Sequence, residues 1–116
     1  MKKTNWLKKK CVPCESGTPM LLREEALRNI KELKGWLLSV DARLIRAEYT
    51  MKNFMAAIQL ISRIARLAEK EGHHPDIHLT GYRKLVVELS THAIGGLSDN
   101  DFVLAAKIAR LPKKLK

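Results

Sequence analysis

A long apolar-periodic segment near the middle of the chain constrains the fold more than any other feature. Between Asn53 and Gly72, apolar side chains recur every three or four residues, which is the spacing of one face of an α-helix. Asn53 is of a residue type that caps helix N-termini, and Gly72 of a type that ends helices. We therefore predict a helix between these two residues. Its expected core stripe is Phe54, Ala57, Ile58, Ile61, Ile64, Ala65 and Ala68.

The apolar surface of this helix is wider than one stripe. Leu60 and Leu67 extend it, and a single chain of 116 residues would leave part of that surface in water. We therefore expect a homo-oligomer, either a dimer or a tetramer, formed through helix and sheet-edge contacts.

Strand-type segments occur in pairs on both sides of the predicted helix. Residues 36–40 and 43–51 are separated by the turn-forming Asp41-Ala42, and residues 77–80 and 84–91 by Gly81-Tyr82-Arg83. In the last of these segments Leu85, Val87 and Leu89 alternate with residues that point the other way. Each pair is therefore predicted to form a hairpin with one face toward the core.

Two shorter helical segments complete the pattern. Residues 23–33 have apolar side chains at helical spacing and are followed by the helix-ending Gly35. Residues 98–101 resemble a capping box that begins a last helix, which stops before Pro112. The predicted order is α-β-β-α-β-β-α. This order favours an α+β fold, with a four-stranded antiparallel sheet and three helices packed on one face.

The length of the chain, 116 residues, is that of one domain. We expect a basic, cysteine-containing N-terminal extension over residues 1–20, a single α+β domain over 21–112 and a basic tail over 113–116. The sequence contains no run of 18 apolar residues and no secretory signal pattern, and its two cysteines are too close together for a secreted disulfide framework. The expected protein is cytoplasmic and has no membrane span.

The net charge of +10 comes from 22 lysines and arginines against 12 aspartates and glutamates. Ten of the basic residues lie in or near the two ends of the chain, where they attract phosphate without specificity. The sequence has only six aromatic residues and no motif that reads DNA or RNA. We therefore expect no specific nucleic-acid partner.

All four histidines, His73, His74, His78 and His92, lie within twenty consecutive residues. The ordinary pKa of histidine is about 6.5, so that one imidazole can donate a proton near neutrality while another accepts one. The sequence has no glycine-rich phosphate loop and no nucleophile elbow. The clustering therefore favours acid–base chemistry.

Metal binding is the alternative for the same side chains. His74, His78 and His92 together supply three nitrogens for a zinc site, although Pro75 interrupts the helical geometry of a HExxH motif. Cys11 and Cys14 have C-x2-C spacing but no second pair, so a four-sulfur site would need another subunit. We expect neither a metal nor a cofactor.

The residues around the histidines resemble the signature of the pterin-4a-carbinolamine dehydratase family. Thr91-His92, followed by Gly95-Gly96-Leu97-Ser98 and Asp101, is similar to the family segment THxxGGLTxxD. Gly35-Trp36 stands in the family's GW position. The resemblance covers residues 20–111, so the Cys11–Cys14 extension lies outside the short form of the family. The remaining matching positions are Glu69, His73-His74-Pro75 and Tyr82.

The resemblance implies dehydration of 4a-hydroxytetrahydropterin to quinonoid dihydropterin, which recycles the cofactor of aromatic amino acid hydroxylases. By position, His73 and His92 are similar to the family's acid–base pair and His74 to its substrate-orienting histidine. Trp36 and Pro75 resemble the pocket walls against the flat pterin, and the alternative for Trp36 is a plain core or edge aromatic. Glu69, one helical turn before His73, is expected to hold an imidazole in one tautomer or to raise its pKa.

A binding role on the same fold is the second hypothesis. The family also contains dimerisation cofactors of a homeodomain transcription factor and Rubisco assembly factors with degraded active sites. Here His73, His74 and His92 are all present, which favours the enzyme. We expect His78 to be structural.

Overall fold

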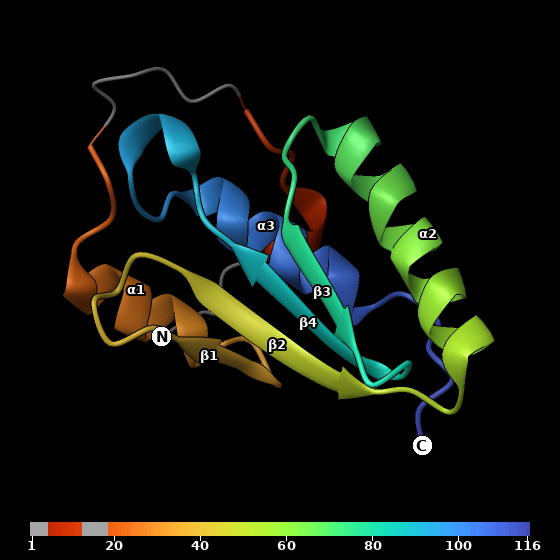
Figure 1. Ribbon diagram of the computed structural model, residues 1–116. Helices are drawn as coiled ribbons and strands as arrows, with labels where there is room; N and C mark the ends of the chain where they lie inside the picture. The colour runs from red at the N-terminus through yellow and green to blue at the C-terminus, as the bar shows by residue number, and fades with distance from the viewer. Residues whose placement is uncertain (1–4, 13–18) are drawn as a thin grey trace.

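The computed structural model describes residues 5–12 and 19–116 and has the predicted α+β architecture (Figure 1). The predicted order of three helices and four strands is confirmed, and two 3₁₀ turns, η1 (Trp6–Lys8) and η2 (His92–Ile94), are added to it. The other elements are α1 (Arg23–Ile30), β1 (Trp36–Leu38), β2 (Ile45–Thr50), α2 (Phe54–Glu71), β3 (Asp76–Thr80), β4 (Lys84–Leu89) and α3 (Asp99–Ala109).

The four strands form one antiparallel sheet in the order β1-β2-β4-β3. Because side chains alternate along a strand, Leu85, Val87 and Leu89 all point to one face, and all three are buried as predicted. Ile45 and Ala47 of β2 lie opposite Leu89 and Val87 and are buried with them. Figure 1 shows α1 and α3 behind the sheet and α2 along its β3 side. The core therefore lies between the sheet and the helices.

Helix α2 begins and ends at the residues that the sequence predicts. The Asn53 side chain accepts a hydrogen bond from the Ala56 N–H at 2.8 Å, which satisfies one of the unpaired donors of the first turn. At the other end Gly72 has φ of 70°, a left-handed conformation that glycine adopts at little cost, and its N–H donates to the Ala68 carbonyl. This reversal sends the chain from α2 toward β3.

The side of α2 that faces the core agrees with the prediction only in part. Ala57, Ile64 and Ala68 of the expected core stripe are buried. Leu60, expected to widen the apolar surface beyond that stripe, is also fully buried, whereas Phe54 and Ile58 are exposed. The apolar surface of the helix is wider than one stripe, and periodicity alone does not determine which edge of it faces the core. The buried residues of α2 are Ala56, Ala57, Leu60, Ile64 and Ala68.

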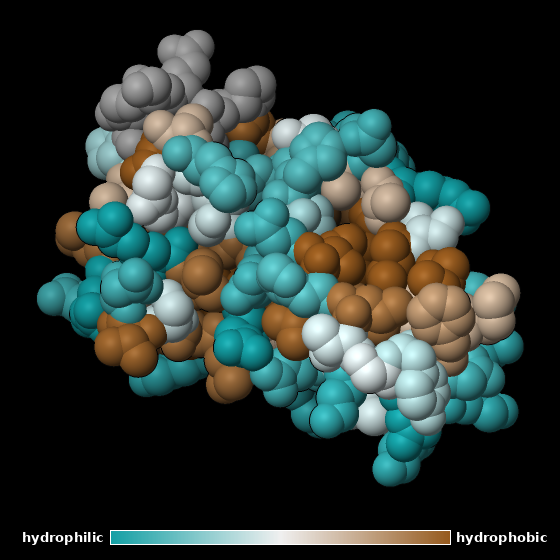
Figure 2. Space-filling model, viewed as in Figure 1, coloured by the Kyte–Doolittle hydropathy of each residue, from teal (hydrophilic) through white to brown (hydrophobic). Residues whose placement is uncertain are grey.

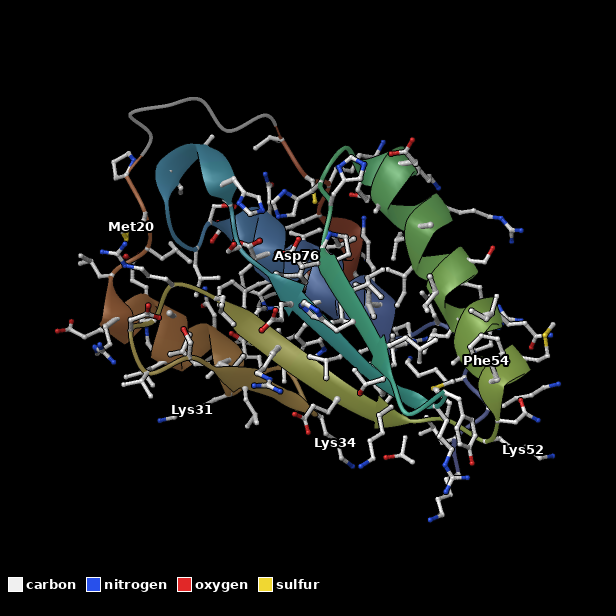
Figure 3. The ribbon with its side chains drawn as sticks, in the orientation of Figure 1. Met20, Lys31, Lys34, Lys52, Phe54 and Asp76 are labelled. Carbon is white, nitrogen blue, oxygen red and sulfur yellow. The ribbon has the colours of Figure 1, made fainter. Side chains whose placement is uncertain are left out.

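The exposed edge of this helix forms an apolar surface. Phe54, Met55 and Ile58 are exposed large apolar side chains, and Phe54 is 49% exposed. Figure 2 shows a hydrophobic area over α2 and the neighbouring part of β3, and Figure 3 places Phe54 at the first turn of α2. We call Phe54, Met55 and Ile58 the α2 patch.

The N-terminal segment packs against α3. Trp6 in η1 is buried, and its ring centroid lies 5.6 Å from that of Phe102. Residues 5–12 therefore add an aromatic side chain to the core. Of the two cysteines with C-x2-C spacing, the structure describes Cys11, and Cys14 lies outside the described residues. Within the described part of the chain, each helix is too short or too polar to cross a membrane.

Candidate active site

Three of the four histidines meet at one cavity. His73 and His74 follow the end of α2, and His92 follows the end of β4. Asp76, labelled in Figure 3, begins β3 immediately after the first two histidines and Pro75. The cavity has a volume of about 350 Å³. Its lining residues are Val12, Gly72, His73, His74, Ser90, Thr91, His92, Ala93 and Asn100.

His73 is the least exposed histidine of the cavity. Its Nε2 lies 2.6 Å from Asp101 Oδ1, and the two side chains are 11% and 0% exposed. A carboxylate accepts hydrogen bonds, so Nε2 carries the hydrogen and the neutral ring keeps its lone pair on Nδ1. Asp101 therefore determines which nitrogen of His73 is available to a substrate.

Asp101 is fixed in turn by two more donors. Its Oδ2 accepts a hydrogen bond from Thr91 Oγ1 at 2.9 Å and from the Ser98 N–H at 3.0 Å. The hydroxyls of Thr91 and Ser98 also lie 2.7 Å apart. Thr91, Ser98 and Asp101 are all buried, so this network satisfies polar groups that would otherwise be costly to bury. The carboxylate has little freedom to turn away from His73.

His74 pairs with Glu69, whose carboxylate Oε2 lies 2.5 Å from His74 Nε2. Glu69 is the last-turn carboxylate that we expected to hold an imidazole, and the imidazole it contacts is His74 rather than His73. Both side chains are exposed, so the pair contributes little to stability. Its effect is to orient the His74 ring at the rim of the cavity.

His92 reaches the cavity from a separate segment of the chain, after β4. It is the first residue of η2, which ends in the left-handed Gly95. The Thr91 N–H donates to the Gly96 carbonyl at 2.8 Å and closes this loop. The loop holds the exposed His92 over the cavity while Thr91, its neighbour, is buried against Asp101.

The other candidate residues lie elsewhere. His78 pairs with Glu88 on the neighbouring strand at 2.9 Å and does not line the cavity, so it does not join His74 and His92 in the zinc arrangement considered above. Trp36 is buried in the core on β1, at the far edge of the sheet from β3, and does not line the cavity. Pro75 leads from His74 into β3 and is not among the lining residues either.

The comparisons with known proteins identify the family of the chain. Residues 19–111 match the family described as pterin 4 alpha carbinolamine dehydratase. The chain belongs to the pterin-4a-carbinolamine dehydratase family.

Individual relatives are similar over most of the chain. A protein of Nitrosospira multiformis, named provisionally as a pterin-4-alpha-carbinolamine dehydratase, is 44% identical to this chain. The match covers 89% of this chain and 88% of that protein. The mitochondrial pterin-4-alpha-carbinolamine dehydratase 2 of Arabidopsis thaliana is 41% identical over 89% of this chain and 57% of its own length. The crystal structure of a transcriptional coactivator/pterin dehydratase from Brucella melitensis superposes with a TM-score of 0.72 and 27% identity. That superposition covers 78% of this chain and 96% of the other.

Within this family fold, the buried network is the part of the site that we did not predict. Asp101 entered the sequence prediction only as a helix-capping residue and as a family position, yet its carboxylate contacts His73. The sequence feature that could have indicated this role is the apolar run after Asp101, which places the first turn of α3 in the core. Val12 and Asn100, which also line the cavity, had no sequence signal.

One ion pair near the cavity predicts how the stability of the protein depends on pH. Burial by itself raises the pKa of Glu71, but hydrogen bonds from the Lys107 ammonium and the Cys11 N–H, with the charge of Lys107, bring that pKa below its ordinary value. A carboxylate with a lowered pKa in the folded state stabilises above its unfolded pKa, about 4.3, and this contribution is lost as the pH falls further.

We therefore expect the free energy of unfolding to fall below about pH 4.3, with part of the fall due to Glu71. Urea unfolding of wild type and Glu71→Gln between pH 3 and 7 measures this part, and the Glu71→Gln curve is expected to be flatter. Glu69→Gln is the control, because Glu69 is exposed. Parallel curves for wild type and Glu71→Gln would contradict the assignment.

Proposed function

We propose that this protein catalyses the dehydration of 4a-hydroxytetrahydropterin to quinonoid dihydropterin. The observation that carries the proposal is the convergence of His73, His74 and His92, from two separate segments, on one cavity with a buried carboxylate behind His73. Membership of the family supports the same reaction. In this role the protein recycles the pterin cofactor of aromatic amino acid hydroxylases.

The reaction needs two proton transfers and nothing else. The C4a–O bond breaks as the hydroxyl receives a proton, the proton on N5 is removed, and a C4a=N5 double bond forms with release of water. Two imidazoles in opposite protonation states can perform both transfers. We assign the acid–base pair to His73 and His92, which line the same cavity and come from two separate segments of the chain.

The remaining groups position the reactants. Asp101 holds the hydrogen of His73 on Nε2 and stabilises the ring when it becomes charged. His74, oriented by Glu69, is proposed to hold the substrate at the rim. This chemistry uses only side chains of the chain, so the proposal includes no metal and no cofactor.

A stopped-flow assay of 4a-hydroxytetrahydropterin decay tests the proposal. Purified protein at micromolar concentration is expected to accelerate the decay well above the buffer rate, and boiled protein is the control. An unchanged decay rate would make a binding role the leading hypothesis. That role has one specific observation in its favour, because the similar Brucella structure is described as a transcriptional coactivator as well as a pterin dehydratase.

The proposal includes a homo-oligomer that covers the α2 patch. Phe54, Met55 and Ile58 lie on one exposed side of α2, a surface that a stable monomer seldom leaves open. We also propose a cytoplasmic location, in keeping with the free thiol of Cys11.

Light scattering is expected to give a particle of at least twice the 13.2 kDa chain mass. Ile58→Glu is expected to lower the mass, because it puts a charge into the buried contact. The control is Leu37→Glu, which changes an exposed leucine of β1 away from the patch. A wild-type particle of 13.2 kDa would refute this part of the proposal.

A further inference from the structure

The N-terminal segment is anchored to the domain at both of its described ends. We call residues 5–12 the strap. At one end Trp6 is buried against Phe102 in α3. At the other end Val12 lies at the cavity that holds the three histidines. The family match begins only at residue 19, so the strap lies outside the matched part of the chain.

Asn100 of α3 holds the Val12 end of the strap. The Val12 N–H donates to Asn100 Oδ1 at 2.9 Å, and Asn100 Nδ2 donates to the Val12 carbonyl at 2.5 Å. One buried amide side chain thus pairs with both backbone groups of one residue, as a neighbouring strand would. We call this pair of hydrogen bonds the Asn100 clamp.

Cys11 adds a second attachment beside the clamp. Its N–H donates to Glu71 Oε1 at 3.1 Å, and the other oxygen of Glu71 accepts from Lys107 Nζ at 2.9 Å. Burial and the nearby Glu71 carboxylate raise the pKa of the Cys11 thiol to about 12. At neutral pH the thiol is therefore protonated, and its Sγ lies 3.6 Å from the Asn100 carbonyl as a weak donor.

These attachments place an apolar side chain at the cavity. Among the lining residues, only Val12 and Ala93 have side chains of hydrocarbon alone, beside imidazoles, hydroxyls and an amide. Val12 is 63% exposed although its backbone is fixed, so its methyl groups are accessible to a bound molecule. A flat heteroaromatic substrate has apolar faces that gain from such a contact.

We propose that Val12 is a specificity-determining residue of the cavity, a wall supplied by the strap and positioned by the Asn100 clamp. The inference rests on the proposed dehydratase function and deepens it. It assigns to the strap the contact with the ring face or substituent of the pterin, while the histidines act on C4a and N5.

Kinetics of Val12→Ala in the full-length protein test the contact. We expect KM to rise about 3- to 10-fold with kcat within about twofold of wild type, because the methyl groups bind the substrate but take no part in proton transfer. Val40→Ala is the matched control, because Val40 is 93% exposed in the turn before β2, and its KM and kcat are expected to be unchanged.

Asn100→Ala tests the clamp. Amide exchange at Val12, followed by NMR, is expected to become faster, and KM to rise as in Val12→Ala. The double variant Val12→Ala, Asn100→Ala is expected to have a KM within about twofold of the worse single variant, because both changes remove the same contact.

The outcomes separate the two proposals. An active wild type with equal KM for Val12→Ala and Val40→Ala overturns the role of Val12 and leaves the dehydratase function standing. An inactive wild type overturns the dehydratase function and the inference that rests on it. Slower exchange or no change at Val12 in Asn100→Ala overturns the clamp.

Discussion

Replacing either His73 or His92 with alanine is expected to lower the dehydration rate about 10²- to 10⁴-fold, the range for losing one general acid or base. Both residues line the same cavity and come from two separate segments of the chain, so we assign one proton transfer to each ring. Single-turnover stopped-flow rates of each variant measure the effect. His78→Ala is the matched control, because His78 pairs with Glu88 outside the cavity, and its rate is expected to stay within a few-fold of wild type.

The double variant distinguishes a catalytic pair from two independent contributions. If the rings act as one unit, His73→Ala and His92→Ala together cost little more than either alone. His74→Ala, by contrast, is expected to raise KM more than it lowers kcat, since His74 is held at the rim by Glu69. If His78→Ala lost most of the dehydration rate while His92→Ala kept the wild-type rate, the assignment of the residues would be wrong even if the protein has the proposed activity.

The fold was largely predictable because each element carries its own local signals. Asn53 and Gly72 mark the ends of α2, and the alternation of Leu85, Val87 and Leu89 marks the buried face of β4. These signals depend on neighbours within a few residues, so no tertiary information is needed to interpret them. The element order, and with it the α+β class, follows from them.

The orientation of α2 was not predictable for the same reason. The apolar surface of the helix is wider than one stripe, and which edge of it faces the core depends on what the sheet and α3 present. Ala57, Ile64 and Ala68 of the predicted stripe pack into the core together with Leu60, while Phe54 and Ile58 face outward. A pattern within one helix contains no information about its partner surface.

The residues of the candidate site were also predictable only in part. The three histidines were found from their clustering and from family spacing, and the structure brings them to one cavity. The family position of Trp36 suggested a pocket wall and its residue type a core aromatic, and Trp36 lies buried in the core. A position in a sequence signature does not say where a strand lies in the sheet. Asp101 depends on contacts across 28 residues of sequence, which only the folded chain reveals.

Asp101→Asn is expected to lower kcat about 10²- to 10⁴-fold while leaving KM nearly unchanged. The asparagine has nearly the same shape, but its amide presents hydrogens where the carboxylate accepts one from His73. Nε2 of His73 then becomes the acceptor and Nδ1 carries the hydrogen, so the nitrogen available to the substrate loses its lone pair. Nitrogen NMR shifts of His73 report the change of tautomer directly. Asp99→Asn, in the same turn of α3 but exposed, is the matched control.

Stability measurements separate this catalytic effect from a loss of structure. Asp101→Ala removes the acceptor of Thr91 and of the Ser98 N–H as well as that of His73, and each buried donor left unpaired costs about 1–3 kcal/mol. Asp101→Asn retains one oxygen for those donors, so its unfolding free energy is expected to lie between wild type and Asp101→Ala. If Asp101→Asn keeps the wild-type kcat, the carboxylate only stabilises the start of α3. If kcat falls while the urea midpoint changes little, Asp101 acts on the reaction through the tautomer of His73.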